Sequence, residues 1–124
     1  MYEKKIPKDF DCGMAVLTEI IGGKWKPYLL HLISNGTKRP FELQKAIPNA
    51  SRRVLDLQLR ELEFHGIVVR KVYAEVPPKV EYYLTEIGKS ILPVVKAMDN
   101  WGLEYLDEFK NIMEIKRAQL NETV

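Results

Sequence analysis

Apolar side chains recur every three to four residues along most of the chain, which is the spacing of helices that bury one face. Within residues 12–33 this spacing predicts two helices, the second from Lys26 to Ile33. Between them stands Gly22-Gly23, and glycine would end the first helix because it adopts the left-handed conformation without steric cost. The apolar positions of the first helix include Met14, Leu17 and Ile21.

Residues 40–65 predict a short helix, a break and a longer helix. The short helix is expected over 40–46, because Pro40 fits a first turn, where its missing N–H costs no hydrogen bond. Pro48-Asn49 breaks the chain, and Ser51 is expected to cap a helix that runs to about residue 65. The buried face of that helix is predicted to hold Leu55, Leu59 and Leu62.

The periodicity changes over residues 67–85. Residues 67–73 and 80–84 are rich in β-branched and aromatic side chains, which favours two strands of a hairpin. The loop between them contains Pro77 and Pro78 and is predicted to be extended. Helical spacing returns over residues 86–118, where Pro93 and Gly102 are expected to kink or divide the helix.

This order of elements describes a winged helix-turn-helix, in which the second helix of the motif enters the DNA major groove. The predicted fold class is therefore mainly α with a small β-hairpin (α+β). A chain of 124 residues fits one such domain, with residues 1–10 as a flexible polar arm. Residues 12–33 precede this motif and residues 86–118 follow it.

Composition places the chain among ordinary globular proteins, with 46% hydrophobic and 29% charged residues. A single cysteine, Cys12, excludes a disulfide within the chain and fits a reducing cytoplasm. The first residues lack the apolar run of a signal peptide, and no stretch approaches the length of a membrane helix. We therefore expect a cytoplasmic protein without a membrane partner.

Charge is distributed unevenly along the chain. Residues 37–60 carry six basic and two acidic side chains, a net charge of +4, and residues 95–124 carry four basic and six acidic ones, a net charge of −2. A solvated charged face is the simplest interpretation of such a cluster. Because this one coincides with the predicted helix-turn-helix, we interpret it as a surface for double-stranded DNA.

Specific residues follow from the helical geometry. Arg52 and Arg53 lie away from the leucine stripe on the first turns of the second helix, where such helices meet base edges, and an arginine can donate two hydrogen bonds to guanine. Asp56 lies beside them, and Ser51 could contact a phosphate. The remaining candidates for phosphate or wing contacts are Arg39, Arg60, Arg70, Lys71 and Lys79.

Several strings resemble the HxlR-type branch of winged-helix regulators, which are relatives of the MarR proteins. They are Ile21-Gly-Gly-Lys-Trp-Lys, Gln58-Leu-Arg-Glu-Leu-Glu, Gly66-Ile-Val, Tyr73-Ala-Glu-Val-Pro-Pro-Lys-Val-Glu-Tyr-Tyr-Leu-Thr and Trp101-Gly. The resemblance implies a sequence-specific transcriptional regulator. It also implies a homodimer joined through its terminal helices, and a palindromic operator.

Cys12 has two interpretations. It stands at the predicted start of a helix, where the helix dipole favours the reactive thiolate. In some proteins of the family that the chain resembles, the matching cysteine senses oxidants or electrophiles. The chain departs from the family in having Gly13, not proline, after this cysteine. An inert interface cysteine is the alternative.

Other classes of function lack support in the sequence. No phosphate-binding glycine loop and no nucleophile elbow is present, so we expect no enzymatic activity. Two distant histidines and one cysteine give no metal-ligand spacing, and no cofactor is predicted. Two alternatives remain, a winged-helix protein-interaction module without DNA binding and a small-molecule binder whose effector the sequence does not identify.

Overall fold

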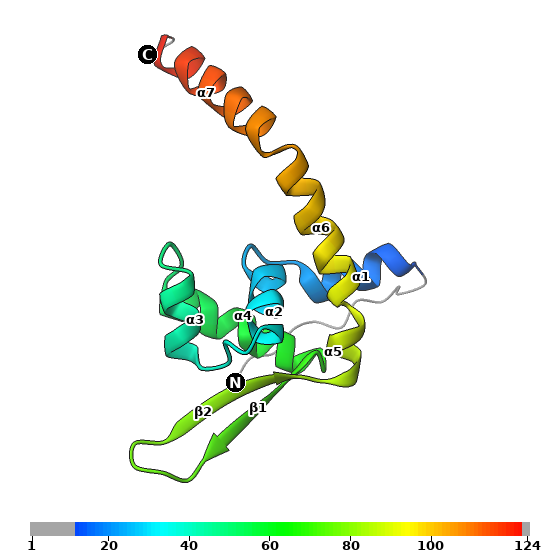
Figure 1. Cartoon of the computed structure of the whole chain (residues 1–124), viewed down its shortest axis with the longest axis vertical. Helices are drawn as coiled ribbons and strands as arrows, with labels where there is room; N and C mark the ends of the chain where they lie inside the picture. Colours follow the sequence, from blue (N-terminus) through cyan, green and yellow to red (C-terminus); the bar gives the residue numbers. More distant parts are fainter. Residues whose placement is uncertain (1–11, 123–124) are drawn as a thin grey trace. The chain divides into compact units, whose positions relative to one another are not determined.

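The computed structural model describes residues 12–122, so the arm predicted over residues 1–10 lies outside the described part of the chain. Helices and a hairpin follow one another in the predicted order (Figure 1). The elements are α1 (Gly13–Ile21), α2 (Lys26–Ser34), α3 (Pro40–Ala46), α4 (Arg52–Phe64), β1 (Val68–Tyr73), β2 (Lys79–Leu84), α5 (Glu86–Ser90), α6 (Leu92–Glu104) and α7 (Leu106–Glu122). The winged helix-turn-helix is thereby confirmed, and the chain divides into two compact units between Leu92 and Pro93.

The core of the first unit is built from the inner faces of its helices. The predicted stripe on α4 is confirmed, because Leu55, Leu59 and Leu62 are all buried. Helices α2 and α3 add Leu29, Leu30 and Leu43, and both helices contact α4. Burial of these side chains fixes α4 on the core by one face and leaves its opposite face for another role.

The hairpin is held to the helices at its base. Strands β1 and β2 pair antiparallel, in a register that runs from Val68 opposite Leu84 to Tyr73 opposite Lys79. The Tyr82 N–H donates a hydrogen bond of 2.8 Å to the carbonyl oxygen of Lys38, so the segment before α3 lies beside β2. The wing and the helix-turn-helix therefore share a backbone contact.

Helix ends confirm the predicted bounds of α4 and correct the conformation expected at Gly22-Gly23. Ser51 caps α4 by accepting the Val54 N–H at 3.1 Å, and Gly66, with φ of +74°, follows the helix in the left-handed region. The left-handed stop predicted at residues 22–23 is wrong, because Gly22 has φ of −66° and the positive-φ glycines lie elsewhere. A Cβ atom on Gly22 would lie 2.5 Å from the Thr18 carbonyl oxygen, so close approach explains this glycine.

The second unit contains most of α6 and all of α7. The helical stretch after the wing is divided at Ile91 and at Tyr105. Pro93 lies in the first turn of α6, where its missing N–H is tolerated. Gly102 lies within α6, and the division expected near it falls three residues later, at Tyr105. Among the described residues no helix is long and apolar enough to cross a membrane.

Candidate nucleic-acid interface

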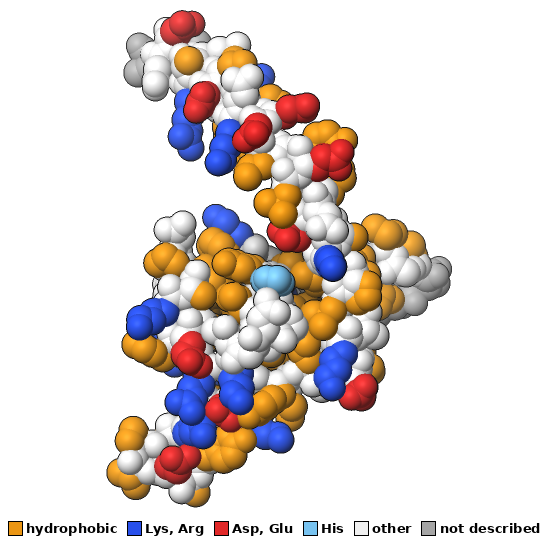
Figure 2. All heavy atoms as spheres, in the orientation of Figure 1, with side chains coloured by type: hydrophobic (Ala, Val, Ile, Leu, Met, Phe, Trp, Pro, Cys, Tyr) orange, Lys and Arg blue, Asp and Glu red, His pale blue; other side chains and the backbone are white. Residues whose placement is uncertain are grey.

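A groove of about 490 Å³ lies between α4 and the wing. It brings together six of the residues selected from the sequence: Arg39, Arg52, Asp56, Arg60, Arg70 and Lys79. Its described lining thus carries five cations, with Asp56 and Glu75 as the acidic members. On the face shown in Figure 2, Lys and Arg side chains gather over the base of the wing. A groove of this charge suits the phosphate backbone of DNA.

The N-terminal turns of α4 supply the side chains expected to read bases. Arg52 is half exposed, and its Nε lies 3.1 Å from Asp56 Oδ1, one helical turn farther along. This ion pair orients the guanidinium along the helix surface and adds little stability at such exposure. Arg53 is exposed on the same helix, but it does not line the groove. Ser51 does not line it either.

A buried carboxylate organises the cations at the base of the wing. Glu81 is 3% exposed, accepts the Tyr83 hydroxyl at one oxygen, and lies 3.3 Å from Arg39 Nε at the other. The ammonium groups of Lys38 and Lys79 lie 3.9 and 3.8 Å from that second oxygen. The Tyr83 hydrogen bond, followed by that of Arg39 and the charges of the two lysines, lowers the pKa of Glu81 to about 2.

Lys71 lies on the face of the hairpin that carries Glu81 and Lys79, and not on the face of Arg70. Because it is opposite Glu81 in the strand register and Arg70 is opposite Tyr82, the two neighbours point to opposite faces of the hairpin. Arg70 lines the groove with α4, and Lys71 does not. The Lys71 ammonium lies 5.0 Å from the centre of the Tyr83 ring, a cation–π contact on the other face.

Comparisons with known proteins agree with this geometry. The model of the HxlR-like helix-turn-helix family matches residues 20–110. The chain belongs to this family. It is 48% identical over 101 residues to the HTH-type transcriptional regulator YkvN of Bacillus subtilis, covering 82% of this chain and 86% of YkvN. The chain is accordingly a DNA-binding transcriptional regulator.

Solved structures of transcriptional regulators have the same fold. The redox regulator HypR in its reduced form superposes with a TM-score of 0.75 at 44% identity, covering 81% of this chain and 99% of that one. The diamide-treated form of YodB from Bacillus subtilis superposes with a TM-score of 0.64 at 34% identity, covering 78% and 97%.

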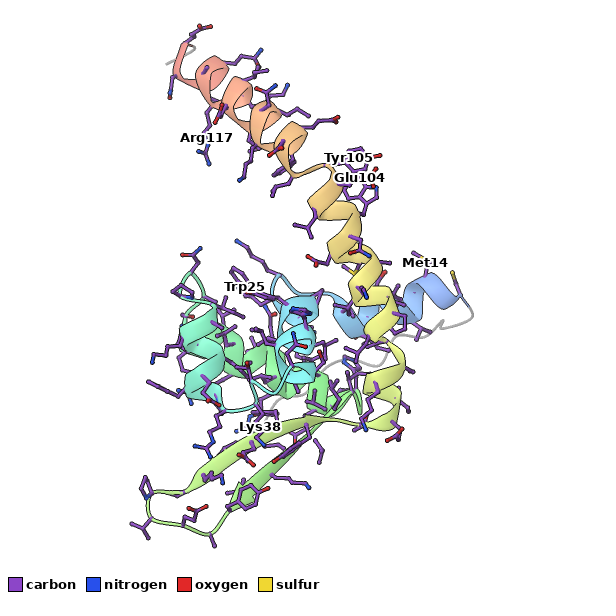
Figure 3. The ribbon with its side chains drawn as sticks, in the orientation of Figure 1. Met14, Trp25, Lys38, Glu104, Tyr105 and Arg117 are labelled. Atoms are coloured by element: carbon purple, nitrogen blue, oxygen red, sulfur yellow. The ribbon has the colours of Figure 1, made fainter. Side chains whose placement is uncertain are left out.

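Sequence reasoning missed two members of the charged cluster at the base of the wing. Lys38 entered only the charge count, although its ammonium contacts Glu81 and lies 5.0 Å from the Tyr83 ring centre; Figure 3 shows it beside the hairpin. Glu81 itself was missed, because a single carboxylate in a strand reads as a solvent-facing residue. A signal was present in the cations at 38, 39 and 79, but only the strand pairing brings them to one acid.

The remaining candidate is Cys12 at the start of the regulator's first helix. Cys12 is an exposed free thiol at the N-cap position of α1. The backbone N–H groups of Ala15 and Met14 lower its pKa below the ordinary thiol value. Within residues 12–122 no group of three or more His, Cys, Asp or Glu side chains could hold a metal ion.

Proposed function

We propose that this HxlR-like regulator binds a palindromic operator as a homodimer, with one groove and one reading helix on each half-site. The observation that carries the proposal is the groove, in which five cations converge beside the N-terminal turns of α4. One comes from the residue before α3, two from α4 and two from the wing. Cations that neutralise phosphates supply the sequence-independent part of the affinity. A pure protein-interaction module has no need of such a groove.

The cations divide into two roles. Arg52 and Arg53 are the first two residues of α4, and their side chains reach base edges in the major groove. Arg39, Arg70 and Lys79 border the groove at the wing and contact phosphates. Ser51, whose hydroxyl oxygen accepts the Val54 N–H, still has its own hydrogen to donate to a phosphate.

Arg60 occupies a different place on the reading helix. It follows Arg52 by eight residues, about 12 Å along the helix axis at 1.5 Å per residue. It lines the same groove, so a phosphate farther along the strand is its expected contact. Asp56 holds Arg52 in place and disfavours a phosphate at that point of the groove.

The second unit supplies the dimer contact. It exposes large apolar side chains at every turn, among them Trp101 and Phe109, which are 66% and 60% exposed. A hollow of about 600 Å³ lies between α6 and α7 and is lined mainly by such side chains. In a dimer with two-fold symmetry, this surface would pack against the same surface of a second copy of the chain.

Oxidant sensing through Cys12 is the second part of the proposal. Its thiol is exposed and its pKa is lowered by the first-turn amides, so a larger fraction is thiolate near neutral pH. The similar regulators HypR and YodB have been solved in reduced, oxidised and diamide-treated forms. Diamide would take two electrons and two protons from the Cys12 thiols of two copies of the chain, which join as a disulfide while diamide becomes a hydrazine. This new bond would change α1 and release the operator.

Fluorescence anisotropy tests operator binding. Labelled DNA from the gene's own upstream region is compared with an unrelated duplex at several salt concentrations. The upstream duplex is expected to bind at least about a thousandfold more tightly. Arg52→Ala/Arg53→Ala should lose most of that preference, and the matched double variant Lys110→Ala/Lys116→Ala should keep it. Equal weak binding of both duplexes by wild type would favour the protein-interaction module.

A separate measurement tests Cys12. Diamide is added to the wild-type complex, and DNA release is followed by anisotropy. Cys12→Ser should bind the operator normally and remain bound in the presence of diamide. Release of the Cys12→Ser protein at the same diamide concentration would overturn the sensing role and leave operator binding untouched.

A further inference from the structure

The inward face of the reading helix α4 is held by residues at the start of α2. Lys26 is 0% exposed, and its Nζ lies 3.0 Å from Glu61 Oε2 on α4. One residue earlier, the Trp25 backbone N–H donates a hydrogen bond of 2.9 Å to Gln58 Oε1, also on α4. Gln58 is 8% exposed, so both contacts lie on the inward face of the helix. Figure 3 shows Trp25 at the start of α2.

Two sequence strings that are far apart in the chain meet at this contact. The segment from Gly22 to Lys26 supplies one side, and Gln58 to Glu61 supplies the other. Gly23 permits the close approach, since a Cβ atom there would lie 3.2 Å from Gln58 Cδ and equally near the Lys26 side chain. The contact thus requires particular residues on both sides.

Stability alone does not account for a buried ion pair. Removing two charges from water is expensive, and well-packed apolar side chains in their place often leave the free energy of unfolding unchanged or raised. An ion pair between Lys26 and Glu61 fixes the distance between these two side chains and thereby the rotation of α4 about its own axis. Apolar packing defines such a rotation less narrowly. Gln58 precedes Glu61 by three residues, so the two groups hold one side of α4 at adjacent turns.

Helix α1 contacts the other end of α4. Glu19 of α1 has its Oε1 3.6 Å from Nε2 of His65, the residue that ends α4. The described chain therefore touches α4 from α1 and from the segment after it. Arg52 lies six residues before Gln58, about 9 Å along the axis, so a small rotation at the inward contacts displaces the reading side chains at the groove.

We propose that Lys26, Gln58 and Glu61 are positioning residues for DNA reading. They set the rotation of α4 about its own axis, so that Arg52 and Arg53 meet base edges in register. They do not touch the DNA. This proposal rests on the proposed operator binding, and its effect is on discrimination between sequences more than on affinity for any duplex.

The double variant Lys26→Met/Glu61→Leu separates positioning from stability. Apolar side chains of similar length should keep the melting temperature near that of wild type. The preference for the upstream duplex over the unrelated one is expected to fall at least about tenfold, and the salt dependence should not change, because no phosphate contact is lost. A double variant that melts like wild type and keeps its full preference would overturn the proposal.

Gln58 offers a matched pair of variants. Gln58→Met removes the acceptor for the Trp25 N–H, and Gln58→Glu keeps an acceptor oxygen in the same place. The first should lose discrimination and the second should retain it. Glu86→Gln is the control for loss of a carboxylate, because Glu86 is exposed and forms a surface ion pair with Lys89. This variant should discriminate between the two duplexes as wild type does. Equal loss of discrimination in Gln58→Met and Gln58→Glu would contradict the proposed role.

A readout without DNA distinguishes this proposal from the proposed function. Amide resonances of the 14.4 kDa chain are recorded by two-dimensional NMR in wild type and in Lys26→Met/Glu61→Leu. The amides of Arg52 and Arg53 should shift, and those of residues 74–78 between the two strands should not. Unchanged Arg52 and Arg53 resonances would overturn the proposal. If the Arg52 and Arg53 resonances shift in the variant but the wild-type protein shows no preference for the upstream duplex, the positioning contact is supported and operator binding is rejected.

Discussion

The groove beside α4 and the surface of the second unit expose opposite kinds of side chain. The groove gathers five cations around about 490 Å³. The second unit exposes apolar side chains around a hollow of about 600 Å³ on α6 and α7, visible in Figure 2 as orange patches along these helices. Figure 3 places Tyr105 at the break between them. Each surface carries a free-energy cost that a suitable partner would remove, like-charge repulsion in one and apolar hydration in the other.

The difference lies in how each surface is prepared for its partner. In the groove, carboxylates hold the cations in place: Asp56 holds Arg52, and Glu81 holds Arg39 and Lys79. On the second unit the exposed side chains are apolar, so complementary shape must select the partner. The groove would bind a polyanion through charges that are already in position, whereas the second unit would bind a second copy of the chain through apolar surfaces of matching shape.

The largest expected effect comes from the apolar surface. Phe109→Asp places a charge on the surface proposed to be covered in the dimer, and the protein should become monomeric by sedimentation equilibrium. Operator affinity should fall about a hundredfold or more, because two linked half-site contacts become independent ones. Lys110→Asp, at the next residue, should remain dimeric. A dimeric Phe109→Asp protein would place the interface elsewhere.

A smaller effect is expected at the wing and distinguishes its two faces. Arg70→Ala removes a cation from the groove, so the slope of log affinity against log salt should decrease by about one per half-site. Lys71→Ala removes a neighbouring cation that lies on the opposite face over Tyr83, and its slope should match wild type. Titrations at four salt concentrations measure both. Equal slopes for the two variants would mean that the DNA contacts both faces of the hairpin.

Asp56 should act in the opposite direction from the cations. Asp56→Ala removes the negative charge that orients Arg52. Binding to an unrelated duplex should strengthen a few-fold because the groove becomes more positive. The preference for the upstream duplex should weaken, since Arg52 loses its fixed orientation. Anisotropy with both duplexes checks this, and a preference that rises in the variant would contradict the orienting role.

The smallest effect concerns stability and pH. The pKa of Glu81 is lowered from an ordinary value of 4.5 to about 2 in the folded state, so its contribution is present above about pH 4.5 and is lost as pH falls toward 2. Glu81→Gln should melt a few degrees below wild type at pH 7, with a difference that shrinks between about pH 4.5 and 2. Urea unfolding at a series of pH values measures both proteins, and a constant difference would show that the carboxylate charge is not responsible.

Patterns within one element allowed much of this structure to be predicted. Leucine spacing located the buried face of α4, and Ser51 marked its start because a hydroxyl accepts a first-turn N–H. Arg52 and Arg53 followed from the same helical geometry. The charge of residues 37–60 indicated a basic surface on this part of the chain, and three of these residues, Arg39, Arg52 and Arg60, do line the groove.

Features that depend on pairing between elements escaped prediction. The face occupied by Lys71 follows from the register of β1 and β2, which the hairpin sequence alone left undetermined. Gly22 was assigned a left-handed conformation from its residue type, although a contact with the Thr18 carbonyl explains it. The contact of Lys26 with Glu61 joins residues 35 positions apart, a separation that no local period reveals.

The anchoring of the wing bears on how such regulators can be recombined. Because Glu81 in β2 is neutralised by cations at 38 and 39, and Tyr82 is bonded to the backbone of Lys38, the hairpin is not an independent module. A chimera that takes its wing from a relative should take residues 38–39 from the same parent. Exchange of the hairpin alone would leave either a buried acid with Lys79 but without the cations at 38 and 39, or those two cations without their acid.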